Sequence, residues 1–295
     1  MATVAVVIPA YNPDETWLRS ALESVICQTF VDWEAVVVDD GSSASLTWCG
    51  DLDERISVVR QANLGLSGAR NRGLRETTAP FVAFLDADDE WLPAKLELQV
   101  RVLEEDVDRV MCSTDFEHID ASGTRIGPGY TGHNRTYVDL LTGCGIVPST
   151  VMVRRTALSR VGPFLPLASG EDWELWLRLA MVNDLSVVDE VLARYRLHSS
   201  NMTLDYLRIL RAGTLILGMH RELALALGEI TIVTAADEGL LALRRRAARQ
   251  AFDAARRSLR RKDYVEFGRH LSSALRFAPV QTIKDIGSVK ILRQR

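Results

Sequence analysis

Three carboxylates follow a short apolar run in the segment FVAFLDADDEW. Asp86, Asp88 and Asp89 come directly after Phe81–Leu85, whose length and composition are typical of a buried strand. Acids in this position emerge at the carboxyl end of the strand, where open α/β sheets bind ligands. They repel one another unless a cation lies among them, and Mg²⁺ or Mn²⁺ completed by substrate phosphates is the usual solution. The segment predicts either such a metal site or an acidic loop in which Asp89 caps a helix that begins near Pro93.

Two further apolar runs end in polar residues, in the segments VVIPAYN and VVVDDGS. In a parallel sheet of consecutive βα units, both ends lie at the same edge. A carboxylate at Asp39 can accept the N–H of a pyrimidine or a ribose hydroxyl, and Tyr11 offers a ring face. The alternative is that residues 39–42 are only a turn made of good turn residues.

Residues 61–73, QANLGLSGARNRG, join a glycine-rich turn to the start of a helix. Free backbone N–H groups together with Arg70 suit a nucleotide or its phosphates. The segment lacks the glycine and lysine spacings of a dinucleotide fingerprint or a P-loop. A plain glycine-rich turn remains the alternative.

The segment SGEDWELWLRLAMV places Glu171 and Asp172 at the mouth of a helix expected over 171–182. Its apolar residues recur at helical spacing, beginning with Trp173 and Trp176. On these residues alone, the simpler interpretation is that both acids only stabilise the positive end of the helix dipole.

A later segment, RYRLHSSNMT, follows a strand and brings His198 beside Arg196. An imidazole at this place is a candidate metal ligand. A lone histidine is more often an ordinary surface or core residue, so that alternative stays open.

The elements that position these residues alternate along the first 120 residues. This alternation predicts an α/β fold with a largely parallel sheet. The expected strands are Thr3–Ile8, Trp33–Val38, Ile56–Arg60 and Phe81–Leu85, and the expected helices are Asp14–Gln28, Ser67–Glu76 and Pro93–Glu105.

The pattern loosens after about residue 110. Asp115–Tyr130 is rich in glycine and predicts a hairpin or a mobile loop. A strand is expected at Ser149–Arg154. From about residue 203 the sequence becomes rich in leucine, alanine and arginine, so we expect a domain boundary near residues 203–206.

The composition is that of a globular protein and argues against several other classes. The chain has 295 residues, 47% hydrophobic and 25% charged, as in an ordinary globular protein. The four cysteines are scattered, which argues against a disulfide framework or a structural zinc site. We see no signal peptide and no apolar stretch of membrane-spanning length, and we expect a cytoplasmic protein without a nucleic-acid partner.

The net charge of −4 conceals an asymmetry. Residues 241–295 carry a balance of +11, and residues 1–240 a balance of −15. Residues 241–262 predict a basic helix with a narrow apolar stripe. Three interpretations remain open for it: packing on the rest of the chain, pairing with a second subunit, or peripheral contact with an anionic membrane at its inner face.

Taken in order, the segments VVIPAYN, VVVDDGS, NLGLSGARNRGL, FLDADDEW, PSTVMVRR, GEDWELWLRLA and YRLHSSNMT resemble family 2 glycosyltransferases of the GT-A fold. The resemblance covers about residues 3–203. It implies a Rossmann-like α/β domain over 1–203 with a mostly parallel central sheet flanked by helices. Its nucleotide-sugar half would span about 1–110 and its acceptor half about 111–203, followed by an α-helical extension over 204–295.

The same resemblance implies where the donor is bound. The positions that match those holding the nucleotide base, ribose and sugar are Pro9, Tyr11, Asp39, Asn63, Arg70 and Asp86. Asp86-Ala87-Asp88 matches the DxD motif, with Asp88 as the direct ligand of Mn²⁺ or Mg²⁺ and Asp86 at the ribose and a metal-bound water. His198 matches a histidine that can approach the metal or the diphosphate.

For the reaction, the resemblance implies an inverting transfer. Asp172 matches the catalytic base, and Glu171 beside it would position the acceptor. A base carboxylate on one side of the anomeric carbon and a metal on the departing diphosphate together supply what this chemistry requires. The expected donor is a nucleoside-diphosphate sugar, a UDP-sugar first, and the acceptor a hydroxyl of a glycan or a lipid-linked glycan.

Two other functions are weaker candidates. A sugar nucleotidyltransferase would need a glycine-rich pyrophosphate loop after the first strand, where this chain has IPAYNPDE. A catalytically inactive scaffold would have lost acids that are all present here. The expected acceptor loops, about 115–135 and 165–169, have no pattern that names the acceptor.

Overall fold

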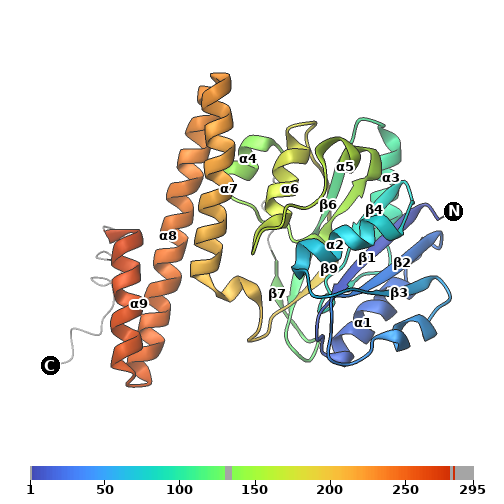
Figure 1. Ribbon diagram of the computed structural model, residues 1–295, viewed down its shortest axis with the longest axis horizontal. Helices are drawn as coiled ribbons and strands as arrows, with labels where there is room; N and C mark the ends of the chain where they lie inside the picture. Colours follow the sequence, from blue (N-terminus) through green and yellow to red (C-terminus); the bar gives the residue numbers. More distant parts are fainter. Residues whose placement is uncertain (1, 130–134, 280–281, 283–295) are drawn as a thin grey trace. The chain divides into compact units, whose positions relative to one another are not determined.

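The computed structural model describes residues 2–129, 135–279 and 282. The chain divides into two compact units (Figure 1). The first comprises the residues up to 140 together with 144–201, and the second comprises 141–143 together with the residues from 202 onwards. Residues 130–134 of the expected acceptor loop lie outside the described residues, as do 280–281 and 283–295 of the expected helical extension.

The first unit is built on a nine-stranded sheet in the order β3-β2-β1-β4-β8-β6-β9-β5, with β7 paired to β6. Its first four strands are parallel neighbours and end within two residues of the predicted strands. These strands are β1 (Val4–Ala10), β2 (Trp33–Asp39), β3 (Ile56–Arg60) and β4 (Phe81–Phe84).

The other half of the sheet is mainly antiparallel. The strands β8, β7 and β5 each run antiparallel to their neighbours, whereas β6 and β9 are parallel to each other. The sheet is therefore mixed, and the prediction of a mostly parallel sheet holds only for its first four strands. These later strands are β5 (Glu90–Trp91), β6 (Met111–Ile119), β7 (Arg125–Pro128), β8 (Met152–Arg154) and β9 (Ser186–Arg196).

Two other expectations for this half can be compared with the structure. The glycine-rich segment after residue 115 forms the β6–β7 hairpin, one of the two predicted alternatives. The strand expected at Ser149–Arg154 is wrong in its first half, because Pro148–Thr150 forms a 3₁₀ turn and β8 begins only at Met152.

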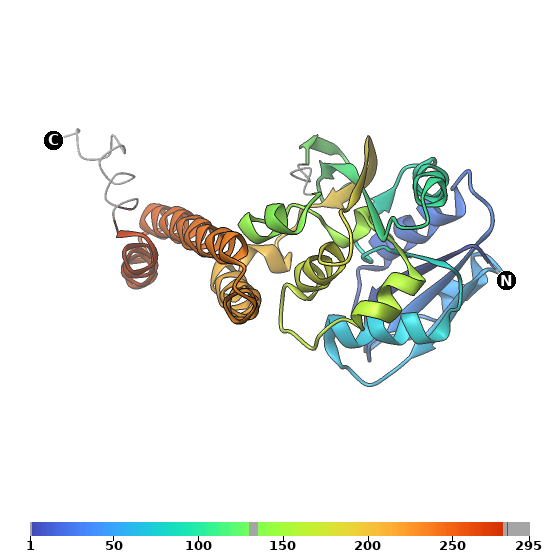
Figure 2. The same cartoon turned by 90° about the horizontal axis from the view of Figure 1, so that it is seen from above.

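Helices cover both faces of the sheet. Figure 2 shows α1 (Glu15–Ile26) and α3 (Lys95–Glu105) on one side, with α2 (Gly65–Glu76), α5 (Arg155–Val161) and α6 (Glu171–Ala180) on the other. The three early helices and α6 begin and end within two residues of the prediction. The remaining short elements of this unit are α4 (Tyr137–Thr142) and the 3₁₀ helices at Thr47–Asp51 and Pro148–Thr150.

Local residues fix where these helices start and how closely they pack. The Asp14 carboxylate accepts hydrogen bonds from the first backbone N–H groups of α1, as an N-cap should. In α2, a Cβ atom at Gly73 would lie 2.4 Å from Cγ1 of Val7. Only glycine therefore lets α2 approach β1 so closely.

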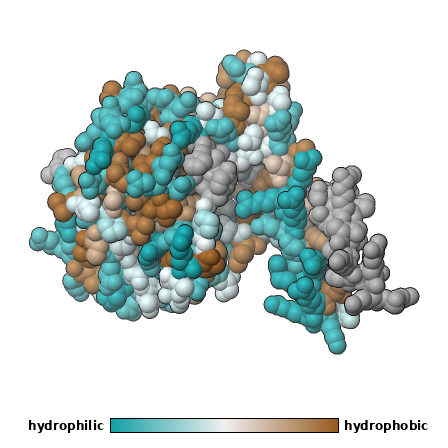
Figure 3. Space-filling model, turned by 180° about the vertical axis from the view of Figure 1, so that it is seen from behind, coloured by the Kyte–Doolittle hydropathy of each residue, from teal (hydrophilic) through white to brown (hydrophobic). Residues whose placement is uncertain are grey.

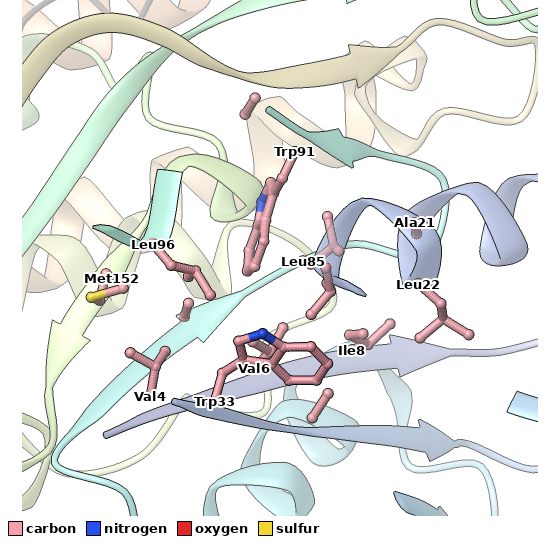
Figure 4. Close-up of a cluster of buried hydrophobic side chains, with 14 of the residues drawn as sticks. Val4, Val6, Ile8, Ala21, Leu22, Trp33, Leu85, Trp91, Leu96 and Met152 are labelled. Carbon is pink, nitrogen blue, oxygen red and sulfur yellow. The ribbon is translucent and has the colours of Figure 1, made fainter. Parts of the chain in front are cut away.

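The core of the first unit lies between the sheet and the pair α1 and α3. Figure 4 shows part of it, where Ile8, Trp33, Leu85 and Trp91 converge from β1, β2, the residue after β4, and β5. All four side chains are buried. Burying each large apolar side chain contributes about 1.5–3 kcal/mol, so this cluster fixes the strands whose ends carry the polar residues.

The second unit is a set of helices, α7 (Tyr206–Leu227), α8 (Ile230–Arg260) and α9 (Tyr264–Phe277), after a 3₁₀ turn at Met202–Leu204. The basic helix predicted over 241–262 is the second part of the longer α8. Alanines form the buried face of α8, so the helices pack closely. Among the described residues, no helix is long and apolar enough to cross a membrane.

Candidate active site

The carboxyl ends of β1, β2 and β4 meet at one edge of the sheet. In the register, Ala10 lies opposite Asp39, and Val7 lies opposite Phe84, two residues before Asp86. The parallel pairing predicted from the sequence thus brings the three polar segments together.

The first two strand ends form an interlocked turn. Pro9 is buried within β1, and the Tyr11 ring after it is 56% exposed. The buried Asp39 carboxylate accepts hydrogen bonds from the backbone N–H of Ser42, at 2.8 Å, and from Nη1 of Arg60, at 2.8 Å. Asp39 is therefore held at the strand end beside an exposed aromatic ring.

The next acid, Asp40, has a structural role. Its carboxylate accepts hydrogen bonds from the backbone N–H groups of Leu64 and Gly65, both at 2.9 Å, and so satisfies the start of α2. Asn63 contributes through its side-chain oxygen, which lies 3.2 Å from the same N–H of Gly65. The turn interpretation therefore applies to Asp40, and Asn63 lies in the loop that enters α2.

The three acids after β4 have three different partners. Asp86 accepts a hydrogen bond from Nη2 of Arg70 at 2.7 Å, and Asp88 lies 2.8 Å from Nε2 of His198. Asp89 is buried and accepts hydrogen bonds from the Ser149 hydroxyl, at 2.5 Å, and from a backbone N–H. The alternative that Asp89 caps a helix is wrong, because α3 begins at Lys95, well beyond it.

Burial and repulsion between carboxylates raise the pKa values of Asp88 and Asp89. Burial raises the pKa of Asp88, the charge of Asp86 raises it further, and the hydrogen bond with His198 opposes both. Burial also raises the pKa of Asp89 well above its ordinary value. A cation at this loop would remove the repulsion that raises the pKa of Asp88.

His198 contacts this loop from 110 residues further along the chain. Its Nδ1 lies 2.8 Å from the hydroxyl of Ser200, which fixes the ring while Nε2 faces Asp88. The Trp17 ring packs against the imidazole with 4.6 Å between ring centroids. The structure therefore brings together Asp88 and His198, two of the three predicted metal ligands, while Asp86 turns to Arg70.

The donor set fits a cation that shares its ligands with a substrate. Among the described residues, no three His, Cys, Asp or Glu side chains gather closely enough to hold a metal ion alone. Mg²⁺ and Mn²⁺ sites of phosphate-transferring enzymes commonly have one or two protein carboxylates, with substrate oxygens and water as the other ligands. Asp88 with His198 and the nearby Asp86 is consistent with that kind of site.

Arg196 holds the acidic loop in place, and sequence reasoning noted it only as the neighbour of His198. Its guanidinium is 2% exposed and donates to the backbone oxygen of Asp88, at 2.8 Å, and to the Glu90 carboxylate, at 2.5 Å. Its backbone N–H binds Asp89 at 3.0 Å. A charged residue at the end of a strand, two positions before a candidate ligand, is the only sequence signal for this role.

The second acid pair lies at the start of α6, after Gly170, which has a positive φ of 74°. Glu171 is buried, and its Oε1 accepts a hydrogen bond from Nη1 of Arg70 at 2.7 Å. Asp172 is half-buried, and its Oδ1 accepts a hydrogen bond from the backbone N–H of Trp173 at 2.8 Å. Burial raises the pKa of Asp172 to about 7, and the charge of Glu171 adds to the shift while Arg70 opposes it.

Arg70 joins the two acid pairs. Its side chain is 1% exposed and forms ion pairs of 2.7 Å with both Asp86 and Glu171. Charge-assisted hydrogen bonds of this kind are among the strongest in proteins. Arg70 was predicted to contact the donor, but the structure directs both of its terminal nitrogens to protein carboxylates.

Comparison with known proteins agrees with this architecture. The model of glycosyl transferase family 2 matches residues 5–162. UDP-Glc:alpha-D-GlcNAc-diphosphoundecaprenol beta-1,3-glucosyltransferase WfgD of Escherichia coli is 32% identical over 76% of this chain and 88% of its own length. A glycosyltransferase of Rickettsia felis is 31% identical over 68% of this chain, which spans only 34% of that longer protein.

Solved structures show the same fold. The crystal structure of S. aureus TarS 1-349 in complex with UDP-GlcNAc has a TM-score of 0.60 and 17% sequence identity, covering 93% of this chain and 91% of that one. At this identity the likeness concerns the fold alone. With the family match over more than half of the chain and the identity to WfgD, it follows that this protein belongs to glycosyltransferase family 2, with the GT-A fold.

Proposed function

We propose that the protein is an inverting glycosyltransferase that moves a sugar from a nucleoside-diphosphate sugar, a UDP-sugar first, to a hydroxyl of a glycan or lipid-linked acceptor. The observation that carries the proposal is the division of the acids by Arg70. This arginine binds Asp86 and Glu171 and leaves Asp88 for a metal and Asp172 for a proton.

We assign donor binding to about residues 1–110, at the sheet edge where the parallel strands end. Pro9, Tyr11 and Asp39 would meet the base and ribose, since the ring of Tyr11 is exposed and the Asp39 carboxylate is held at the strand end. Asn63 lies in the loop that leads into α2 and would extend this contact. The name of WfgD supports a UDP-sugar as the first donor to test.

The proposed metal site consists of Asp88, His198 and Asp86. Asp88 and His198 would be the side chains nearest a bound Mn²⁺ or Mg²⁺, and Asp86 would act from its ion pair with Arg70. When bound, the ion would neutralise the diphosphate leaving group, which then needs no acid from the protein. Arg196 would keep the Asp88 backbone in position for this role.

The acceptor half, about residues 111–203, would supply the base. A general base must reach the acceptor hydroxyl and have a pKa near the working pH. Asp172 is half-buried and has a pKa raised to about 7, whereas Glu171 is buried in its ion pair with Arg70. Asp172 would take the hydroxyl proton as the oxygen attacks, and Glu171 would position the acceptor.

Direct attack by the acceptor inverts the anomeric centre, because the leaving group departs from the opposite face. The name of WfgD describes a beta-1,3 linkage, which supports a β product as the first one to seek. Its name also describes a diphosphoundecaprenol acceptor, which supports a lipid-linked glycan as the acceptor. The helices α7, α8 and α9 that follow residue 203 would meet the inner membrane face or a second subunit.

The test is transfer by the purified protein. UDP-sugars are offered in Mn²⁺ with free and lipid-linked glycans, and the product is analysed by NMR. A β-linked product from an α-linked donor is expected. An α-linked product would remove Asp172 from its role, and a protein that neither transfers nor hydrolyses any nucleotide sugar would support the inactive scaffold.

A further inference from the structure

The second unit contains a cavity of about 450 Å³ that the proposed reaction does not use. It lies between the start of α7, the last turns of α8, and α9. Its α8 wall is one helical face, since its members recur at three- and four-residue spacing. The lining residues are Leu204, Tyr206, Gln250, Asp253, Ala254, Arg257, Ser258, Arg261 and His270.

Two arginines line this cavity, one in the last turn of α8 and one at its C-cap. Arg257 and Arg261 are four residues apart, where like charges destabilise a helix unless an anion lies between them. Within the described part of the chain, neither guanidinium has a carboxylate at ion-pair distance. The acid of the lining, Asp253, lies 4.0 Å from Arg256 on the same helix.

The surroundings of the cavity strengthen its positive charge. Residues 241–270, which include the start of α9, hold ten Lys or Arg residues and three acids. Figure 3 shows this part of the second unit as mainly hydrophilic. Such a potential raises the local concentration of anions and speeds their binding.

The opposite wall is fixed by hydrogen bonds. The Tyr206 hydroxyl lies 2.8 Å from Nδ1 of His270, and Nε2 of His270 lies 3.3 Å from the Glu266 carboxylate. Ser258 and Gln250 add a hydroxyl and an amide to the lining. A cavity lined by preformed polar groups together with two guanidinium groups is suited to recognise an oxyanion with several oxygens.

We infer that this cavity is a phosphate-binding site, in which Arg257 and Arg261 grip a phosphate monoester, phosphodiester or diphosphate. The planar guanidinium presents parallel N–H donors that match phosphate oxygens, so arginine suits this ligand better than lysine. The phosphate could belong to a soluble molecule or to the headgroup of a membrane lipid. The site is independent of the proposed transfer reaction.

The test compares two double variants of the full chain with equal loss of charge. Arg257→Gln with Arg261→Gln removes the two cavity arginines, and Arg244→Gln with Arg245→Gln removes two exposed arginines of α8 outside the cavity. Calorimetry with sodium phosphate and sodium diphosphate, in EDTA to suppress metal-dependent binding, measures the soluble ligands. Flotation with phosphatidylcholine vesicles, with and without phosphatidylglycerol, measures the lipid.

We expect saturable binding of one anion per chain, weakened at least tenfold, about 1.4 kcal/mol, by the cavity variant and little by the control. Soluble binding without flotation would identify a free phosphate compound, and phosphatidylglycerol-dependent flotation sensitive to the cavity variant would identify a lipid headgroup. Equal losses in both double variants would show a diffuse basic surface and overturn the site. Absence of binding in every assay would overturn it as well.

Discussion

The two acid pairs of the first unit differ in origin but are divided in the same way. Asp86 and Asp88 follow a parallel strand, whereas Glu171 and Asp172 begin a helix. In each pair one acid is bound by Arg70 and the other is not. Asp88 and Asp172 are the acids that do not bind Arg70, and burial raises the pKa of each.

The two pairs differ in what binds the acid that Arg70 leaves free, which is Asp88 in one pair and Asp172 in the other. Asp88 meets an imidazole, a group that commonly binds metals, so the proposed cation would have two ligands here. Among the residues that the structure describes, the partner of Asp172 is the backbone N–H of Trp173, and no cationic side chain lies at hydrogen-bond distance from its carboxylate. One buried arginine thus separates a site suited to charge neutralisation from a site suited to proton transfer.

The largest effect expected from breaking this arrangement is on donor binding. Asp88→Ala should abolish metal-dependent binding of UDP, because the carboxylate next to the proposed cation is lost. The fold should be retained, since one of several mutually repelling acids is removed. Calorimetry with UDP in Mn²⁺ measures the binding, and thermal unfolding without metal measures the stability.

Glu76→Ala is a suitable control for Asp88→Ala, because this acid forms a partly exposed ion pair with Arg72 at a helix end. Its UDP affinity should match that of the wild type. Unchanged UDP affinity in Asp88→Ala would show that the metal assignment is wrong.

The next largest effect concerns stability. Arg70→Gln should leave Asp86 and Glu171 without their cation, one of them buried. Removing one partner of a buried ion pair typically costs about 3–5 kcal/mol of the free energy of unfolding. Chemical denaturation near neutral pH measures the loss.

Arg101→Gln is the control, since Arg101 also pairs with a carboxylate, that of Glu97 at 3.2 Å, but both side chains are exposed, at 61% and 45%. Exposed pairs contribute about 0–1 kcal/mol. Equal losses in the two variants would contradict the special role of Arg70.

A smaller effect is expected from pH. Asp172 must be deprotonated to act as a base, and its pKa is raised to about 7. Turnover at saturating donor and acceptor should therefore fall about tenfold per pH unit below that value and level off above it. A profile that stays flat down to about pH 5, near the ordinary pKa of a carboxylic acid, would place the base elsewhere.

The sequence predicted the parallel half of the fold well because its signals are local. Each apolar run that ends in polar residues, such as the one before Asp86, fixes a strand and its carboxyl end. The Asp14 cap fixes the start of α1. The antiparallel half depends on pairings between distant segments, such as Glu90 with Arg194, which no local pattern contains.

The site residues show the same difference between local signals, which can be predicted, and contacts between distant segments, which cannot. The acids were found because several of them stand together, and His198 because its type is rare. The arginines that bind these residues were not predicted as their partners. Arg196 lies more than a hundred residues after Asp88, whose backbone oxygen it binds, and Arg70 lies more than a hundred residues before Glu171. A long flexible side chain has no spacing signature, so its partners follow only from the folded structure.

The most direct test compares Asp172→Asn with Glu171→Gln in one transfer assay with the same UDP-sugar and acceptor. Both variants lose one carboxylate at the start of α6 and keep its shape. Loss of a general base lowers turnover about 10²–10⁴-fold, so Asp172→Asn should fall in this range while still binding UDP in Mn²⁺ like the wild type. Glu171→Gln should fall less. The opposite ranking, with Asp172→Asn keeping a tenth or more of wild-type turnover, would contradict the assignment of Asp172 as the base.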